Sequence, residues 1–217
     1  MVEVSELRAS APRQSQVGVR AAHRAAVAMS RALDTSFLGG SRNGTMGATM
    51  ARQLFILRHA KSSWDDPSLP DHDRPLAPRG RKAARRLAAF AEDARLRPEL
   101  VLCSSATRAR ETLDLIAGSL GAPEVVVEEG LYGASANALL DRLRRVPDDV
   151  ESVLLVGHNP AMQDLAVLLS TPGPRVDEVS EKLPTGALLR FRVSRPWSEL
   201  ASAGAELEEV VLPRELG

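Results

Sequence analysis

Two short apolar runs in this sequence are each followed by a histidine, and this feature constrains the fold more than any other. Residues 54–57 lead directly into Arg58 and His59, and residues 153–156 lead through one glycine into His158. An apolar run of this length is typical of a strand buried on both faces of a parallel sheet. The carboxyl ends of such strands meet at one edge, where open α/β sheets bind their ligands. The sequence therefore predicts that His59 and His158 share a site.

From residue 52 onward, strand-length apolar runs alternate with amphipathic stretches of helix length. This alternation predicts a three-layer α/β/α sandwich around a mainly parallel sheet. We expect Pro78 to begin a helix, because its missing amide hydrogen would be unpaired in a first turn anyway, and Ser105 and Asn159 to cap two others. The expected strands are 53–57, 100–103, 124–127, 152–156, 187–193 and 206–212, and the expected helices are 78–95, around 113–120, around 139–143 and 160–169, with a chain break at 171–174.

Composition excludes several classes of protein. The 217 residues are enough for one core of ordinary size, and 28 Lys and Arg residues balance 28 Asp and Glu residues. This balance does not predict binding to nucleic acid or to an anionic membrane. Cys103 is the single cysteine, which fits a reducing compartment, and the four histidines show no zinc-site spacing. Because no apolar stretch approaches the roughly 20 residues that span a bilayer, we expect a cytoplasmic protein.

Residues 1–50 differ from the rest of the chain. They are rich in Ala, Ser, Arg and Gly and show no sustained strand or helix pattern, so we expect a disordered extension. Two early glutamates count against a transit peptide. Met46 and Met50 directly precede the first expected strand, and a start site assigned too far upstream is therefore the alternative explanation. Residues 51–217 form the expected domain, for which we favour a monomer.

Two arginines accompany the histidines. Arg58 directly precedes His59, and Arg108 follows a third apolar run at 101–103. A guanidinium group binds phosphoryl oxygens bidentately, which an ammonium group does not. Nearby positive charge also lowers the pKa of an imidazole, and the neutral imidazole is the nucleophile. We therefore predict a phosphoryl-transfer site in which the same arginines bind phosphate and prepare His59.

Three segments around these residues match a known family pattern. Arg-His-Ala-Lys-Ser-Ser-Trp at 58–64 and the segment 71–80, which contains Asp-His-Asp-Arg-Pro-Leu, resemble elements of the SixA-type phosphohistidine phosphatases, a branch of the histidine phosphatase superfamily whose members carry Asp-x-Arg-Pro-Leu before the first helix. Segment 104–112 is similar to the superfamily's Ser-Ser-Pro-x-x-Arg element, with Ala106 in place of proline. The resemblance covers about residues 52–212.

This resemblance implies a phosphoglycerate mutase-like fold and a role for each residue of the site. His59 takes the phosphoryl group and forms a covalent phosphoenzyme. The transferring oxygens are stabilised by His158, Arg58 and Arg108. No metal and no organic cofactor are implied.

The loop after the nucleophile carries further polar residues. Lys61 and Ser62 lie close enough along the chain to reach phosphate, and we expect them to contribute to its binding. Arg74 either touches substrate or pairs with one of the aspartates at 71 and 73, and we favour the pairing. His72 is expected to be a solvated loop residue.

A general acid is the least defined part of the site. Glu128 and Glu129 follow the third expected strand and are candidates by position only. Imidazole has a pKa near ~6.5 and is a good leaving group, so a missing acid would favour phosphohistidine over a sugar phosphate. A cysteine-dependent phosphatase is disfavoured, because four residues separate Cys103 from Arg108 whereas its loop needs five.

The sequence therefore predicts a phosphohistidine phosphatase that acts on a phosphorylated protein through a covalent phosphohistidine at His59. The first alternative is a phosphatase for a small phosphorylated metabolite, with Glu128 or Glu129 as the acid. The second alternative is a phosphate-binding module that has lost turnover, against which the retained histidines and arginines argue. Short loops between the helices leave little chain for a lid over a small molecule, which favours the protein substrate.

Overall fold

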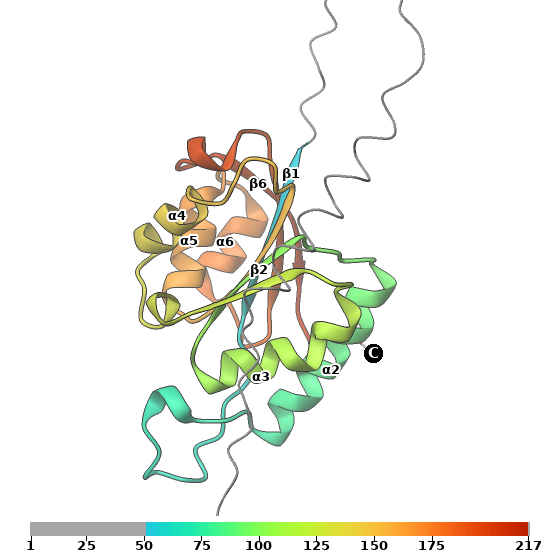
Figure 1. The fold of residues 1–217 in the computed structure, drawn as a ribbon, viewed down its shortest axis with the longest axis vertical. Helices are drawn as coiled ribbons and strands as arrows, with labels where there is room; N and C mark the ends of the chain where they lie inside the picture. The colour runs from blue at the N-terminus through green and yellow to red at the C-terminus, as the bar shows by residue number, and fades with distance from the viewer. Residues whose placement is uncertain (1–50, 217) are drawn as a thin grey trace, which may run out of the picture. The chain divides into compact units, whose positions relative to one another are not determined.

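The computed structural model describes residues 51–216, which form a six-stranded sheet with helices on both faces (Figure 1). The strand order is β3-β2-β4-β1-β5-β6. The strands are β1 (Arg52–Arg58), β2 (Leu100–Ser104), β3 (Glu124–Glu128), β4 (Ser152–Gly157), β5 (Leu188–Val193) and β6 (Ala205–Val211). The helices are α2 (Pro78–Asp93), α3 (Thr107–Ile116), α4 (Ala136–Leu143), α5 (Ala161–Leu169) and α6 (Pro174–Glu181). The extension expected at 1–50 lies outside the described residues.

The sheet is mainly parallel, as the sequence predicts. Strands β3, β2, β4 and β1 are parallel, whereas β5 and β6 add to the β1 edge in antiparallel pairs. In register, Arg58 of β1 lies opposite Gly157 of β4, and Val156 of β4 lies opposite Cys103 of β2. The residues that follow these three strands therefore meet at one edge of the sheet.

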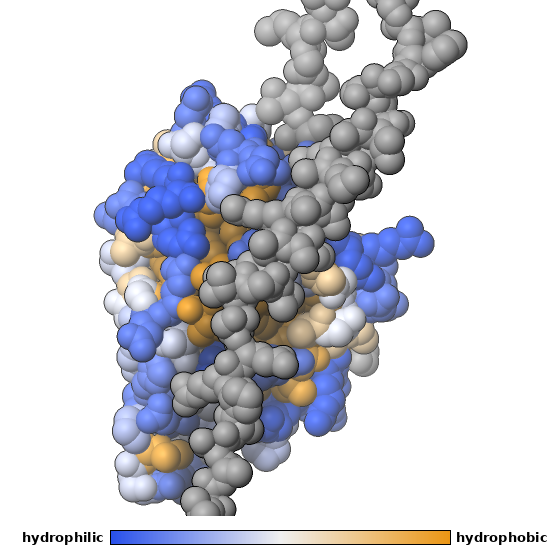
Figure 2. Space-filling view, viewed as in Figure 1, coloured by the Kyte–Doolittle hydropathy of each residue, from blue (hydrophilic) through white to orange (hydrophobic). Residues whose placement is uncertain are grey.

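Alternate residues of β1 belong to two separate cores. Leu54 and Ile56 pack into the core that is shared with α4, α5 and α6. Phe55 and Leu57 pack into the core that is shared with α2 and α3. Figure 1 shows these two helix layers on opposite sides of the sheet. Because β1 is covered on both faces, its sequence is continuously apolar rather than alternating. Hydrophobic surface is exposed between the layers in the face that Figure 2 shows.

Ser105 and Asn159 do not cap helices, contrary to the sequence prediction. The α3 and α5 helices begin without a side-chain cap. The Ser105 hydroxyl is instead hydrogen-bonded to the ring of His72. The Asn159 amide donates to the side chain of Gln163 and to the carbonyl of Leu183. Ser105 fails to cap because a distant residue, His72, takes its hydroxyl. The Asn159 side chain is instead held through its amide nitrogen, and its oxygen, the group that would cap, has no partner among the described residues.

The α6 helix lies directly after the segment where the sequence predicts only a chain break. Pro174 occupies the first turn of this helix, where its missing amide hydrogen costs no intrahelical bond. Val179 is its one buried residue and Val176 packs partly buried against the same core, so the apolar pattern of this helix rests on two valines. In the part of the chain that the structure describes, no helix is long and apolar enough to cross a membrane.

Gly80 lets α2 approach the segment that follows His59. A Cβ atom at Gly80 would collide with the backbone carbonyl of Lys61, which accepts a hydrogen bond from Ala77 at 2.8 Å. We expect Gly80→Ala to lower the free energy of unfolding by ~1–3 kcal/mol, because the backbone must shift. A Cβ atom at Gly118 has no neighbour within 4 Å. Gly118→Ala should therefore change the free energy of unfolding by less than ~0.5 kcal/mol. Urea denaturation measures both, and equal effects would contradict the close approach.

Candidate active site

The backbone holds His59 between two other segments at the carboxyl edge of the sheet. Its amide donates to the carbonyl of Gly157 at 3.0 Å, and its carbonyl accepts from the amide of Gly186 at 3.1 Å. Gly186 has a φ of 80°, a left-handed conformation that favours glycine. The His59 residue is only 7% exposed. The end of β1 therefore presents this imidazole in one fixed position.

Hydrogen bonds assign the tautomer of His59. Its Nδ1 lies 2.7 Å from the carbonyl oxygen of Ala60, which can only accept, so the proton is on Nδ1. The Nε of Arg108 donates to His59 Nε2 at 3.3 Å. A backbone carbonyl that binds one ring nitrogen in this way fixes which nitrogen is available for chemistry. The lone pair of His59 is therefore on Nε2 and points toward the arginine.

The surroundings also keep His59 uncharged. Burial is the largest cause that lowers its pKa, to about 3, and the charges of His158, Arg108 and Arg58 act in the same direction. The hydrogen bond to Ala60 opposes this shift without reversing it. At neutral pH the ring is therefore neutral. The sequence predicts this state from the neighbouring arginines, whereas burial is the larger cause.

His158 lies beside His59, as the two apolar runs predict. The ring centroids are 4.8 Å apart, and His158 Nε2 lies 2.8 Å from the hydroxyl oxygen of Ser104. Burial, followed by the charge of Arg108, lowers the pKa of His158 to about 4. Its Nδ1 is buried and has no hydrogen-bond partner among the described residues. This second neutral imidazole thus keeps one buried ring nitrogen unpaired among the described residues.

Arg58 and Arg108 lie at the same site and are held by backbone carbonyls. Arg58 donates to the carbonyl of Leu183, its buried Nε has no partner among the described residues, and burial lowers its pKa. Arg108 is 7% exposed and donates to His59 and to the backbone carbonyl of Asp71. Two cationic forks beside a neutral nucleophile are a binding site for a phosphoryl group.

Asp71 and Tyr132 complete the site, and the sequence reasoning assigned neither of them to it. Asp71 Oδ2 accepts from Arg108 at 2.8 Å and from the Tyr132 hydroxyl at 2.9 Å, and Asp71 Oδ1 accepts from Arg74 at 3.0 Å. Asp71 begins the Asp-His-Asp-Arg-Pro-Leu segment at 71–76, and the resemblance of this segment to the family element was the available signal. Nothing in the spacing of Tyr132 could have placed it there, because 61 residues separate it from Asp71.

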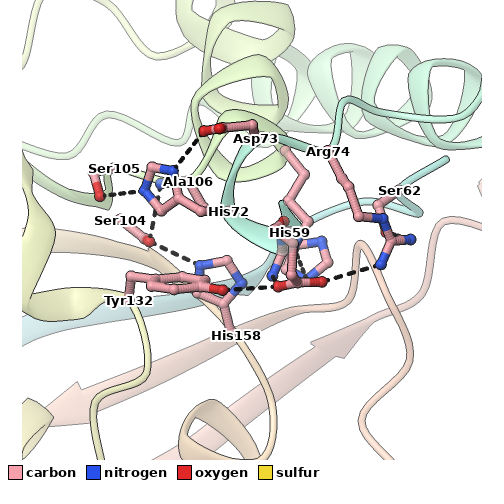
Figure 3. A network of polar contacts seen from close by, with 12 residues as sticks. His59, Ser62, His72, Asp73, Arg74, Ser104, Ser105, Ala106, Tyr132 and His158 are labelled. Atoms are coloured by element: carbon pink, nitrogen blue, oxygen red, sulfur yellow. Dashed lines mark hydrogen bonds and ion pairs between the residues drawn. The ribbon is translucent and has the colours of Figure 1, made fainter. Parts of the chain in front are cut away.

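The loop residues Arg74 and His72 have structural contacts of different kinds. Arg74 pairs with Asp71, which agrees with the favoured pairing role, and its guanidinium lies over the ring of Trp64 at 3.1 Å. His72 is not simply solvated, contrary to expectation. Its ring nitrogens lie 3.0 Å from Asp73 and 2.8 Å from the Ser105 hydroxyl (Figure 3). His72 therefore fastens the loop to the residues that follow β2.

Four predicted residues remain. Lys61 and Ser62 contact residues of the loop that follows His59, whereas Glu128 and Glu129 lie at the end of β3 and just after it. Ser62 accepts from Arg74 at 3.3 Å, and the Lys61 carbonyl anchors Ala77, so their contribution to phosphate binding stays a prediction. Glu128 accepts hydrogen bonds from Arg142 on both carboxylate oxygens. Glu129 is exposed in the short 3-10 helix Glu129–Leu131. The role of either glutamate as general acid also stays a prediction.

A cysteine nucleophile and a bound metal ion are two other ways in which a site can carry phosphatase chemistry. Burial raises the pKa of Cys103 to about 12, so its thiol stays protonated at neutral pH. Among residues 51–216, no group of three or more His, Cys, Asp or Glu side chains could hold a metal ion.

Comparison with known proteins agrees with this geometry. The family model "Histidine phosphatase superfamily (branch 1)" matches residues 54–142. An uncharacterized protein of Mycobacterium tuberculosis (strain ATCC 25618 / H37Rv) is 37% identical over 162 residues, which is 73% of this chain and 100% of the relative.

Two solved structures of SixA proteins are also similar. The SixA protein of Nakamurella multipartitia is 31% identical with a TM-score of 0.67, over 75% of this chain and 96% of that one. For the SixA protein of Agrobacterium tumefaciens, the identity is 28% and the TM-score 0.64, over 75% and 98% of the two chains. Fold and site thus define a phosphatase that uses histidine. The chain belongs to the histidine phosphatase superfamily and is of the SixA type.

The lowered pKa values predict how stability depends on pH. Both His59 and His158 have folded pKa values below the unfolded value of ~6.5, so the unfolded chain binds more protons in acid. The two histidines contribute their full share to the stability of the folded state above pH ~6.5. This contribution is lost as the pH falls toward their pKa values in the folded protein. At pH 5 we expect a loss of about 2 kcal/mol per histidine relative to pH 7.5.

Urea denaturation at pH 7.5 and pH 5 measures this effect. The double variant His59→Asn/His158→Asn keeps polar side chains at both positions but removes both titrations. We therefore expect it to lose less stability between the two pH values than the unmodified protein does. Parallel losses in the two proteins would contradict the neutral, buried state of the histidines.

Proposed function

We propose that this protein is a phosphohistidine phosphatase whose substrate is a phosphorylated protein. The observation that carries the proposal is the state of His59. Its Nδ1 proton is held by Ala60, and its Nε2 lone pair faces Arg108. A nucleophile prepared in this way can accept a phosphoryl group without first losing a proton.

In the first step of the proposed reaction, His59 Nε2 attacks the phosphorus atom and the bond to the leaving group breaks. Charge on the three phosphoryl oxygens is bound by the free Nε of Arg58, by Arg108 and by Nδ1 of His158. Such transfer depends mainly on positioning and charge stabilisation, which fixed buried donors provide without reorganising. The carbonyl of Ala60 stabilises the positive charge that appears on the phosphorylated ring.

In the second step, water attacks the phosphoryl group on His59 and releases inorganic phosphate. The electron pair of the breaking N–P bond returns to Nε2, and the ring recovers its neutral form. The strong preference of His59 for the neutral state, caused first by burial, favours this release. The phosphoenzyme is therefore a short-lived intermediate rather than a stable product.

The proposed substrate class follows from the leaving group. Imidazole leaves without strong acid catalysis, since its pKa is near ~6.5, whereas an alkoxide needs a proton donor. Asp71 accepts hydrogen bonds from Arg108, Arg74 and Tyr132. Glu128 is paired with Arg142. Both SixA relatives carry the name phosphohistidine phosphatase. These observations support a phosphohistidine substrate rather than a sugar phosphate.

Replacement of His59 tests the proposal. We expect His59→Ala to lower phosphate release from a phosphohistidine protein by at least ~10³-fold, because the nucleophile is lost. Cys103→Ala, which removes the buried thiol, should retain activity. Phosphate release by the unmodified chain and by each variant is measured with two substrates, the phosphohistidine protein and a sugar phosphate. Transfer of radiolabel to the unmodified chain but not to His59→Ala would identify the phosphoenzyme.

The outcomes separate the three functions. Faster turnover of the sugar phosphate than of phosphohistidine would favour the metabolite phosphatase. Phosphate binding without turnover of either substrate would favour the binding module. Label on the His59→Ala protein would contradict the assignment of the nucleophile.

A further inference from the structure

We infer that Asp71 selects the leaving group: its carboxylate accepts a hydrogen bond from the ring N–H of the substrate's phosphohistidine and so favours phosphoramidates over phosphate esters. This inference rests on the proposed function and adds a specificity-determining residue to it. It gives a second role to a carboxylate that also pairs with Arg108 and Arg74.

The site is divided by depth into two halves. The side chain of Arg108 is only 8% exposed, whereas that of Asp71 is 54% exposed. Substrate enters from solvent, so the phosphoryl group reaches the buried half with Arg108 and His59. The leaving group stays in the outer half, where Asp71 and Tyr132 lie.

A single guanidinium group joins the two halves. Arg108 donates through Nε to the nucleophilic Nε2 of His59 at 3.3 Å and through a terminal nitrogen to Asp71 Oδ2 at 2.8 Å. The carboxylate is therefore separated from the nucleophile by one guanidinium and two hydrogen bonds. A phosphoryl group with an imidazole ring beyond it is of similar length, which places the far ring nitrogen near Asp71.

Asp71 is held in the acceptor state. Partial burial opposes its ionisation, but the hydrogen bond from Tyr132 and the charges of Arg108 and Arg74 hold the pKa of its carboxyl below the usual value. Its neighbour Asp73 is directed to His72 instead. An ionised carboxylate has no proton to donate, so Asp71 accepts a hydrogen bond from the leaving group rather than acting as a general acid.

The reaction balances without a proton donor when the substrate ring carries its own N–H. The protonated phosphohistidine binds with its free ring nitrogen donating to Asp71. The N–P bond breaks, its electron pair stays on the leaving imidazole, and the lone pair of His59 Nε2 forms the new N–P bond. The imidazole leaves neutral with its N–H, and the positive charge moves to His59, whose Nδ1–H donates to Ala60.

This exchange explains why an ester would be a poor substrate. An ester oxygen has no N–H to offer Asp71, and the negative charge that develops on it is repelled by the carboxylate. Asp71 therefore raises the reactivity of one leaving group and lowers that of the other. A purely structural aspartate, which only orients Arg108, would affect both substrates alike.

The test compares Asp71→Asn with the matched variant Asp73→Asn in the full chain. The substrates are free phosphohistidine and p-nitrophenyl phosphate. For Asp71→Asn we expect kcat/KM for phosphohistidine to fall about 10- to 100-fold, because a charge-assisted hydrogen bond is weakened. Activity on p-nitrophenyl phosphate should fall much less, so that the ratio of the two kcat/KM values shifts toward the ester. Asp73→Asn should leave the ratio of the two substrates unchanged.

The pH profile gives a second measurement. The carboxylate stabilises the protonated substrate ring, and Arg74, Arg108 and Tyr132 are the groups that face it. In Asp71→Asn the alkaline limb of kcat for phosphohistidine, which reports the enzyme–substrate complex, should therefore move to lower pH. Inhibition by inorganic phosphate should remain or become stronger, which would show that Arg58 and Arg108 still bind phosphate in the variant. Tyr132→Phe, which loosens the carboxylate, should cause a smaller selective loss.

Equal losses on both substrates, or no loss on phosphohistidine, would overturn the inference. In either case the proposed function would stand as long as the unmodified chain hydrolyses phosphohistidine. An unmodified chain that hydrolyses only the ester would overturn the proposed function and the inference with it. The unmodified chain and the variants therefore report on the two proposals separately.

Discussion

The parallel pairing of β1 with β4 is the interaction on which the rest of the site depends. It brings His59 and His158, which are 99 positions apart in the chain, to a ring separation of 4.8 Å. Both strands are buried on both faces, and a shift of one residue in register would exchange the side chains between the two cores. Packing therefore determines the register, and the register determines where the two imidazoles lie.

Charge balance at this edge follows from burial. Arg108 is almost completely buried, and a buried cation needs a partner. Asp71 provides one, and Tyr132 and Arg74 hold it in place. Burial and the charges of Arg108 and Arg58 disfavour a protonated ring at both histidines, and Asp71 opposes this only partly at His158, so both rings are neutral. The requirement for a stable interior and the requirement for a nucleophile are thus met by the same arrangement.

The sequence was sufficient for the sheet and for the residues at the ends of its strands. Buried strands leave continuous apolar runs, and a residue that directly follows such a run has little freedom in where it lies. Pro78 likewise identified the start of α2, because the preference is local. The α6 helix was missed because it is short, its apolar pattern rests on Val176 and Val179, and it directly follows a Pro- and Gly-containing segment that indicates a break.

Polar side chains in loops were predicted less well, since each has several partners within reach and tertiary structure selects among them. Ser105 was assigned to a helix cap but contacts His72, which is 33 residues away. By itself, the sequence determined the mainly parallel sheet and the positions of Arg58, His59, Arg108 and His158, because apolar periodicity and short spacing fix both. Only the tertiary structure decided the tautomer of His59, the neutral state of both histidines and the partners of Asp71, because these depend on burial and on atoms from distant segments.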